Sequence, residues 1–367
     1  MNASTSTLIR PEHAATAEVL DLPLPSARRR EQPLPSPADL RQRLPLSAAM
    51  AHRVREGREA IRAVLDGRDP RLLVVIGPCS LHDPVSALEY ADRLAELAPQ
   101  VSDQLLLVMR AYVEKPRTTI GWKGLVYDPQ LDGSGDMAGG LELSRRLMLG
   151  MLERGLPIAT ELLQPLVAGY FDDLLGWAAI GARTSESQVH REMVSGLDLP
   201  VGFKNGTDGS IGIATDAMRS AAHPHQHFGI DAQGRPSLVQ TQGNPDTHLV
   251  LRGGHAGPNF DAASVQQIRQ GLEKLGLEPS IMVDCSHANS GKDPLRQPAV
   301  LDSVLDQRLA GDASLRGVML ESHLFDGCQP LSGELRYGVS ITDGCLGWSG
   351  TEALLLNAAQ RLRRDHA

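Results

Sequence analysis

Eight short apolar runs, separated by stretches of helical periodicity, restrict the fold of this chain more than any other feature. Each run is rich in β-branched residues or leucine and ends in a polar cluster. Strands that are apolar throughout are buried on both faces, as in a parallel sheet covered by helices. Eight such units favour a closed (β/α)8 TIM barrel, with an open doubly wound sheet as the alternative. The runs span 72–80, 105–111, 157–162, 177–183, 200–206, 248–254, 281–288 and 317–324.

The segments around these runs predict how the chain is organised. Residues 1–46 are rich in Pro, Ser, Ala and Arg without sustained periodicity, which predicts a partly extended N-terminal arm. Residues 47–66 have helical spacing and predict an entry helix. The remainder of 47–367 is expected to form one catalytic barrel domain. Between the fifth and sixth strands, 226–243 predicts an inserted β-hairpin, whereas 112–138 resembles a long active-site loop.

Composition and charge argue against several classes of protein. The 36 basic and 44 acidic residues give a net charge of −8, which argues against a general nucleic-acid surface. No apolar run approaches the roughly 20 residues that span a bilayer. The sequence begins without a basic segment followed by an apolar one, and its four cysteines contain no CxxC pair, so neither secretion nor a disulfide framework is expected. We therefore expect a cytoplasmic protein whose partners are small molecules.

Side chains capable of chemistry stand at the carboxyl ends of nearly all the predicted strands, where barrel enzymes place their active sites. One set is cationic and indicates a polyanionic ligand, because guanidinium groups match phosphate and carboxylate geometry. The alternative for each cation alone is an ordinary surface ion pair. This set comprises Arg110, Lys115, Arg117, Arg183, Lys204 and Arg252, with Glu161 at the end of the third strand.

A second set of strand-end residues could bind a metal ion. It comprises Cys79, His287, Glu321 and Asp343. A thiolate, an imidazole and two carboxylates suit Mn, Fe, Co or Zn better than Mg, which prefers oxygen ligands alone. No local spacing motif supports the site, and Cys79 could be an ordinary buried cysteine, or His287 a general base. The metal hypothesis therefore depends on a barrel bringing four distant positions to one rim.

Eight motifs in order resemble the type I, bacterial and yeast-like, 3-deoxy-D-arabino-heptulosonate 7-phosphate (DAHP) synthases over residues 47–362. They are GPCSLHDP, EKPRTTIGWKG, GARTSESQVHRE, GFKNGTDG, LRGG, DCSHANS, GVMLESHL and SITDGCLGW. The resemblance implies a metal-dependent transferase that condenses phosphoenolpyruvate (PEP) with erythrose 4-phosphate and water. The products are DAHP and phosphate, in the first step of the shikimate pathway of aromatic amino-acid biosynthesis.

The resemblance also assigns roles by position. It makes Cys79, His287, Glu321 and Asp343 the ligands of one divalent metal ion per subunit. It assigns the catalytic role to Lys115, His287 and Cys79. It places PEP against Arg110, Lys115, Arg183, Lys204 and Arg252, with Glu161 nearby. Erythrose 4-phosphate would meet Lys115, Pro116, Arg117 and Thr118.

Two departures from the family pattern concern regulation. Gln164, Ala168 and Gly169 replace residues of the effector pocket found in phenylalanine-sensitive relatives, and Asp198 would add a buried carboxylate there. We expect insensitivity to phenylalanine or response to another effector, as in a paralogue that serves secondary metabolism. The resemblance also implies a homodimer or homotetramer.

Three other functions are compatible with parts of the sequence. A sister enzyme that uses arabinose 5-phosphate shares the barrel, but it typically has Asn in the segment that here reads Lys115 to Thr118. A Schiff-base aldolase could use Lys204 or Lys115 as its nucleophile. A non-catalytic barrel has no need of both a metal set and an anion set.

Overall fold

The computed structural model describes residues 31–365, all but the first four of which belong to the unit Pro35–Ala367. Residues 1–30 of the expected arm therefore lie outside the described part. Within the rest of that arm, Pro37–Arg43 form helix α1 instead of extended chain. Ser36 begins α1 with a capping box, in which its hydroxyl accepts from the Asp39 amide and the Asp39 carboxylate accepts in return. Helix α2, Ala48–Leu65, follows at the place expected for the entry helix.

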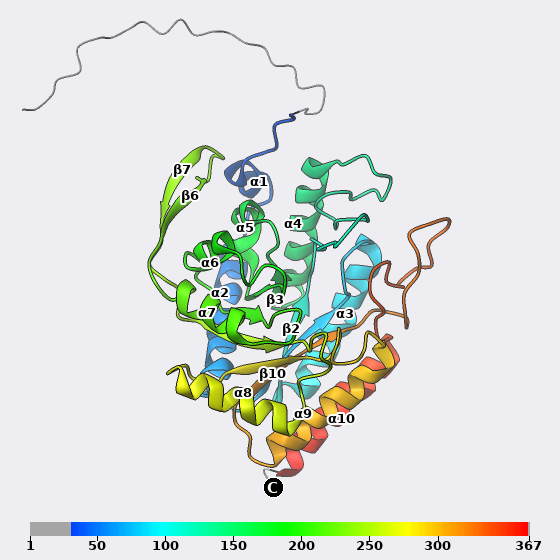
Figure 1. Cartoon of the computed structure of the whole chain (residues 1–367). Helices are drawn as coiled ribbons and strands as arrows, with labels where there is room; N and C mark the ends of the chain where they lie inside the picture. Colours follow the sequence, from blue (N-terminus) through cyan, green and yellow to red (C-terminus); the bar gives the residue numbers. More distant parts are fainter. Residues whose placement is uncertain (1–30, 366–367) are drawn as a thin grey trace, which may run out of the picture. The chain divides into compact units, whose positions relative to one another are not determined.

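Eight parallel strands close into a barrel, as predicted, and the open sheet is excluded (Figure 1). Closure is visible in the register of the first strand, because Leu73 pairs with Leu106 on one side and with Gly317 on the other. The strands are β1 (Leu72–Gly77), β2 (Leu105–Arg110), β3 (Ile158–Glu161), β4 (Trp177–Ile180), β5 (Val201–Lys204), β8 (Thr247–Leu251), β9 (Ile281–Asp284) and β10 (Leu315–Glu321).

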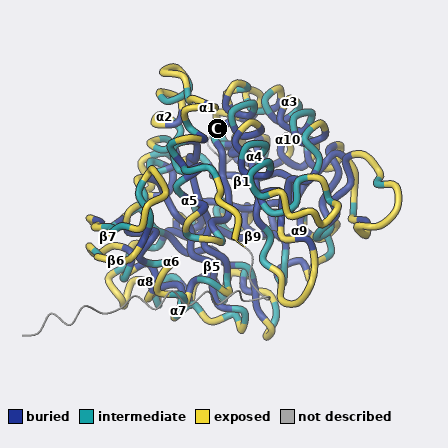
Figure 2. Tube along the Cα trace, turned by 90° about the horizontal axis from the view of Figure 1, so that it is seen from above, coloured by how far each residue is buried: buried dark blue, intermediate teal, exposed yellow. Residues whose placement is uncertain are grey.

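The barrel interior and the shell around it form two apolar clusters, and the strands are buried on both faces (Figure 2). Leu73 and Trp177 belong to the inner cluster, whereas Leu72 and Val74 pack outward under the helices. Helix α2 contributes its apolar stripe, including Ile61, to the inner cluster. Because these contacts lie near the beginnings of the strands, α2 covers the amino end of the barrel.

The remaining elements surround the barrel. Antiparallel strands β6 (Gln226–Ile230) and β7 (Pro236–Gln240) form the hairpin predicted between the fifth and sixth barrel strands. Aspartates begin several helices: the side chain of Asp83 accepts from two amides at the start of α3, and Pro84 follows it. The helices are α3 (Pro84–Val101), α4 (Met137–Glu153), α5 (Pro165–Phe171), η1 (Asp172–Leu174), α6 (Gln188–Val194), α7 (Gly212–Ala221), α8 (Ala262–Lys274), η2 (Pro294–Arg296), α9 (Gln297–Leu309) and α10 (Trp348–Asp365).

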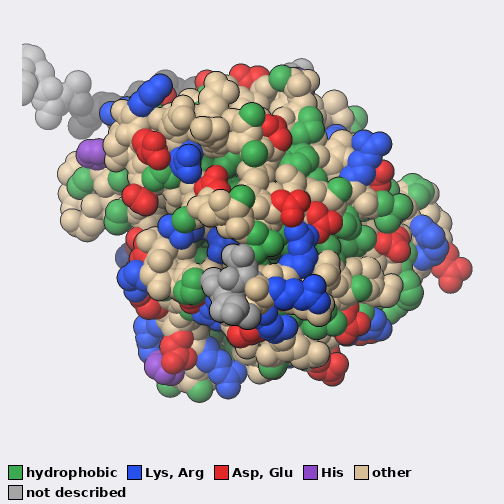
Figure 3. All heavy atoms as spheres, turned by 90° about the horizontal axis from the view of Figure 1, so that it is seen from below, with side chains coloured by type: hydrophobic (Ala, Val, Ile, Leu, Met, Phe, Trp, Pro, Cys, Tyr) green, Lys and Arg blue, Asp and Glu red, His purple; other side chains and the backbone are tan. Residues whose placement is uncertain are grey.

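The surface mixes charges of both signs. On the face shown in Figure 3, Lys and Arg side chains and Asp and Glu side chains are scattered among hydrophobic and other residues. Among the helices of residues 31–365, none has the length and apolarity needed to cross a membrane.

Candidate active site

The carboxyl ends of the parallel strands bring chemically active side chains to one rim of the barrel. Arg110 is the last residue of β2, Glu161 of β3, Lys204 of β5, Asp284 of β9 and Glu321 of β10. All five side chains are buried. Charged groups are seldom buried without partners, so their mutual contacts define the site.

Cys79, Glu321 and Asp343 form a cluster whose ligand atoms all lie within 4.8 Å of one another. Cys79 follows β1, Glu321 ends β10, and Asp343 comes from the loop before α10. One sulfur and two carboxylates are a donor set that suits a transition metal better than magnesium. The structure thus brings together three of the four residues predicted to bind a metal, and their chemistry fits such an ion.

His287, the fourth predicted ligand, lies outside this tight cluster but lines a small cavity together with Glu321 and Asp343. Its Nδ1 is 2.9 Å from the Asp284 carboxylate and 2.8 Å from the Ser286 hydroxyl. These contacts occupy Nδ1 and leave Nε2 for a ligand. The backbone of His287 has φ of 55°, which few residues other than glycine adopt and which is often found at functional sites.

Lys115 connects the long loop after β2 to the cluster. Its Nζ lies 3.0 Å from the Cys79 sulfur and 2.8 Å from an Asp343 carboxylate oxygen. Burial disfavours ionisation of Asp343, but the charge and hydrogen bond of Lys115, together with the charges of His287 and Lys292, lower the pKa of that carboxyl. Burial likewise opposes the charge of Lys115, yet the neighbouring thiol and carboxylates raise the pKa of its ammonium, which stays protonated.

Arg110 is fully enclosed beneath this cluster. Its Nη2 donates to the Glu321 carboxylate at 2.9 Å and to the Cys79 carbonyl at 3.1 Å. The guanidinium carbon lies 3.6 Å above the centre of the Tyr112 ring, a cation–π contact. Arg110 therefore fixes the orientation of Glu321 toward the candidate metal position.

A second cavity, of about 80 Å³, contains three of the predicted anion-binding cations. Its lining includes Arg183, Lys204, Arg252, Glu161, Pro116 and His287. The Lys204 ammonium lies 3.2 Å from Asp284 and 3.8 Å from Glu161. Burial opposes its charge, but these carboxylates raise the pKa of Lys204. A lysine that stays protonated is a poor nucleophile, which disfavours the Schiff-base alternative.

Arg117 and Thr118 occupy a different position from the other predicted binding residues. Both are exposed on the loop that follows Lys115, and neither lines the anion cavity. The structure therefore groups three of the six cations, Arg183, Lys204 and Arg252, around one cavity and leaves Arg117 and Thr118 outside its lining.

Two residues of the site were missed from the sequence. Asp284, with no exposed surface, accepts from Ser286 and contacts both His287 and Lys204. It stands at the end of an apolar run, so the rule that identified its neighbours applies to it as well. Tyr112, by contrast, lies within an apolar context, and no sequence signal distinguishes it from a core residue.

Glu114 provides a pH-dependent contribution to stability. Its carboxylate accepts from the Leu163 and Gln164 amides and from the Tyr127 hydroxyl, but burial dominates and raises its pKa to about 7. The unfolded pKa is about 4.3, so the folded state binds the proton more tightly. The contribution of Glu114 to the free energy of unfolding is therefore fully present below pH 4.3 and is lost as the pH rises to 7.

We expect Glu114→Gln to remove this loss, because the amide keeps the shape and hydrogen-bonding capacity of the side chain. Relative to the wild type, the variant should gain about 3 kcal/mol in free energy of unfolding between pH 4.3 and 7. Urea unfolding across that pH range measures the difference. Glu153→Gln, at an exposed position, is the matched control, and parallel pH profiles for wild type and Glu114→Gln would contradict the assignment.

The prediction that the Asp198 carboxylate is buried is wrong. We expected a buried carboxylate beside an effector pocket, but the Asp198 side chain is 87% exposed. Arg62 holds it at the surface through a 2.7 Å ion pair. Ala168 and Gly169, in contrast, do line a cavity of about 360 Å³ between α5 and the β6–β7 hairpin. The Gln164 side chain begins α5 by accepting from the Leu166 amide.

Comparisons with known proteins agree with this geometry. Residues 46–356 match the model of the DAHP synthetase I family. The chain is 56% identical to the Tyr-sensitive phospho-2-dehydro-3-deoxyheptonate aldolase of Escherichia coli K12, over 84% of this chain and 87% of the relative. Its identity to the Phe-sensitive enzyme of the same organism is 51%, over 84% and 89%. The structure of phospho-2-dehydro-3-deoxyheptonate aldolase from Francisella tularensis SCHU S4 superposes with a TM-score of 0.89 and 42% identity, covering 91% and 98% of the two chains. The chain belongs to the DAHP synthetase I family.

Proposed function

We propose that the chain is a DAHP synthase that joins PEP to erythrose 4-phosphate at the carboxyl end of the barrel. One observation carries the proposal: a cavity lined by Arg183, Lys204 and Arg252 adjoins the Cys79, Glu321 and Asp343 cluster, with His287 lining the cavities on both sides. Two phosphorylated substrates repel each other, and only a concentrated positive charge can hold them together. The resemblance and the family membership point to the same reaction.

The reaction forms one carbon–carbon bond and one carbon–oxygen bond, the latter from water, and breaks the carbon–oxygen bond that joins phosphate to PEP. The enol carbon of PEP attacks the aldehyde carbon of the sugar, water adds to the resulting cationic carbon, and phosphate leaves. One proton of the added water goes to the former aldehyde oxygen and the other leaves with phosphate. Arg183, Lys204 and Arg252 bind PEP and offset its charge. Lys115 remains protonated and stabilises negative charge on the former aldehyde oxygen. Arg117 and Thr118, at the approach to the cavity, bind the sugar phosphate.

Cys79, His287, Glu321 and Asp343 would hold one divalent ion, and the thiolate favours Mn, Fe, Co or Zn. Such an ion, when bound, supplies a Lewis acid for the aldehyde. Asp284 orients His287 through Nδ1, and Arg110 orients Glu321, so both side chains are fixed before the ion arrives.

Phosphate release tests the substrate and the metal together. With PEP and erythrose 4-phosphate we expect rapid release, which a chelator should abolish and added Mn²⁺, Fe²⁺, Co²⁺ or Zn²⁺ should restore. Replacing the sugar by arabinose 5-phosphate should lower the rate strongly. Preference for the five-carbon sugar would overturn the proposed substrate, and full activity after exhaustive chelation would overturn the metal site.

We also propose that phenylalanine does not regulate this chain, because the α5 segment departs from the phenylalanine-sensitive pattern at Gln164, Ala168 and Gly169. Its relatives include both Tyr-sensitive and Phe-sensitive enzymes, so an aromatic effector of another kind is consistent with the family. In an inhibition assay with each aromatic amino acid, phenylalanine at low concentration should leave the rate unchanged. Strong inhibition by phenylalanine would contradict this proposal.

We further propose a cytoplasmic homodimer or homotetramer, on the basis of the family resemblance. Light scattering of the purified chain distinguishes the two assemblies from a monomer.

A further inference from the structure

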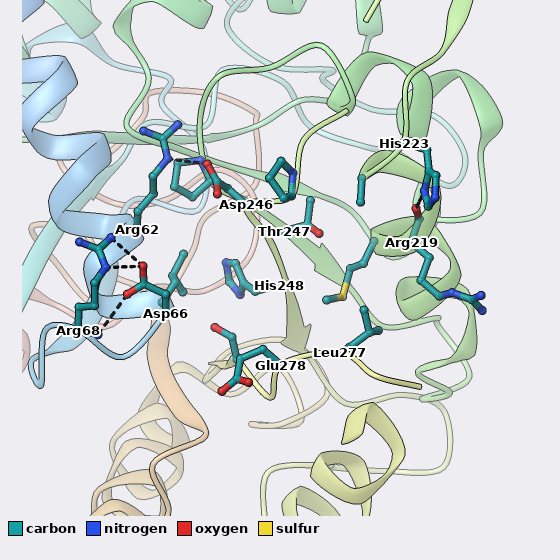
Figure 4. A pocket seen from close by; sticks show the side chains of 16 residues that line it. Arg62, Asp66, Arg68, Arg219, His223, Asp246, Thr247, His248, Leu277 and Glu278 are labelled. Atoms are coloured by element: carbon teal, nitrogen blue, oxygen red, sulfur yellow. Dashed lines mark hydrogen bonds and ion pairs between the residues drawn. The ribbon is translucent and has the colours of Figure 1, made fainter. Parts of the chain in front are cut away.

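Another, larger cavity of about 470 Å³ opens at the amino end of the barrel (Figure 4). Residues of α2 lie along one side of the view, residues of α7 along the other, and the His248 ring lies between them. The cavity has apolar walls that include Leu65, Met218, Pro245 and Leu277. Its size and its mixture of apolar walls with few polar groups are those of small-molecule sites.

His248, at the start of β8, has a tautomer fixed by its neighbour. The Trp177 indole, which can only donate, lies 2.9 Å from the His248 Nε2. Burial lowers the pKa of His248 to about 4, so the ring is neutral and its proton lies on Nδ1. That Nδ1–H is buried and, apart from a weak contact with the Leu249 backbone, has no hydrogen-bond partner among the described residues. An unpaired buried donor is costly, which makes it a group that a ligand can satisfy.

Ser280 provides a second group of the same kind. It immediately precedes β9, and the Leu249 amide donates to its carbonyl, so Ser280 lies beside His248 across the two strands. Its hydroxyl is also buried without a hydrogen-bond partner in the part of the chain that the structure describes, and both residues line the same cavity.

The charged residues at the mouth leave the cavity close to neutral. Arg62 pairs with Asp246, and Arg68 pairs with Asp66 (Figure 4). A highly charged ligand therefore finds no concentrated counter-charge here, in contrast to the catalytic rim.

We propose that this cavity is a binding site for a small apolar ring compound that carries an acyl oxygen. The oxygen accepts hydrogen bonds from the Ser280 hydroxyl and the His248 Nδ1–H, and the ring packs against Met218 and Leu277. A ketone and a carboxylate share this chemistry. The site is separate from the catalytic residues, all of which lie at the carboxyl end of the strands.

Two probes test the proposal on the full chain. We expect 2-acetonaphthone or 2-naphthoate to bind one per chain with Kd below about 1 mM, a range typical of ligands of this size. Fluorescence titration gives the affinity, and comparison of the two probes shows whether the site prefers the ketone or the carboxylate. Saturating PEP should leave the binding unchanged, because PEP occupies the other end of the barrel.

Variants locate the bound probe. Ala222→Trp, at an exposed position of the cavity wall, should weaken binding at least tenfold while DAHP synthase activity is retained. Ala262→Trp, at an exposed position on α8, should leave binding unchanged. Ser280→Ala should weaken binding about 3- to 10-fold through the lost hydrogen bond. Absence of binding, competition by PEP, or equal affinity in the wild type and either Ala222→Trp or Ser280→Ala would each overturn the proposal.

Discussion

Replacing Cys79 with serine is expected to lower the rate of DAHP formation by more than about 100-fold, since loss of even an outer-shell partner costs about 10- to 100-fold. The thiol is fully buried and contributes the only sulfur to its cluster with Glu321 and Asp343. A serine hydroxyl is a poor substitute, because it stays protonated and binds transition metals weakly. Steady-state kinetics and the metal content of the purified variant measure the two effects.

The matched control is Cys328→Ser, which changes the exposed thiol of the same chain. It should retain both activity and metal content. If Cys79→Ser kept its metal and its rate, the cluster would not be the metal site. Unchanged circular dichroism in both variants separates loss of the metal from loss of the fold.

Replacing Arg110 with leucine is expected to destabilise the protein by about 3–5 kcal/mol and to suppress activity. The side chain is almost completely buried and makes an ion pair with Glu321, which is equally buried. The variant leaves the Glu321 carboxylate buried without its partner and no longer held toward Cys79 and Asp343, so the rate of DAHP formation should fall together with the stability.

Urea unfolding and steady-state kinetics test these two effects separately. Arg154→Leu is the control, because Arg154 forms a more exposed ion pair with Asp92 and should change stability by less than about 1 kcal/mol. Equal stability of the Arg110 and Arg154 variants would show that the buried pair contributes little.

The barrel could be predicted because its strands are apolar on both faces. Runs such as 72–80 and 105–111 are continuous, and such runs bury only between an inner core and an outer layer of helices. Helix α1 could not be predicted in the same way. It has seven residues, too few to show periodicity, and depends on the Ser36 cap and on packing against α5.

The residues of the site could be predicted where their side chains lie at the carboxyl ends of strands. Cys79, Lys204 and Glu321 were identified by that rule, and the structure places all three at the rim. Tyr112 serves the site through its ring face, a role that the sequence does not mark. Asp198 was misjudged because its exposure depends on the fold around it, where Arg62, from a helix distant in the sequence, holds the carboxylate at the surface.

Helix α2 leaves the barrel with one catalytic opening, at the carboxyl end of its strands. Its apolar stripe covers the amino end, and the side chains that fill the barrel interior are buried in the described part of the chain. With PEP bound as we propose, substrates enter, and phosphate and the seven-carbon sugar leave, through the carboxyl end. The released phosphate therefore shares its exit with the incoming PEP, and each turnover must clear the cationic cavity before the next can begin.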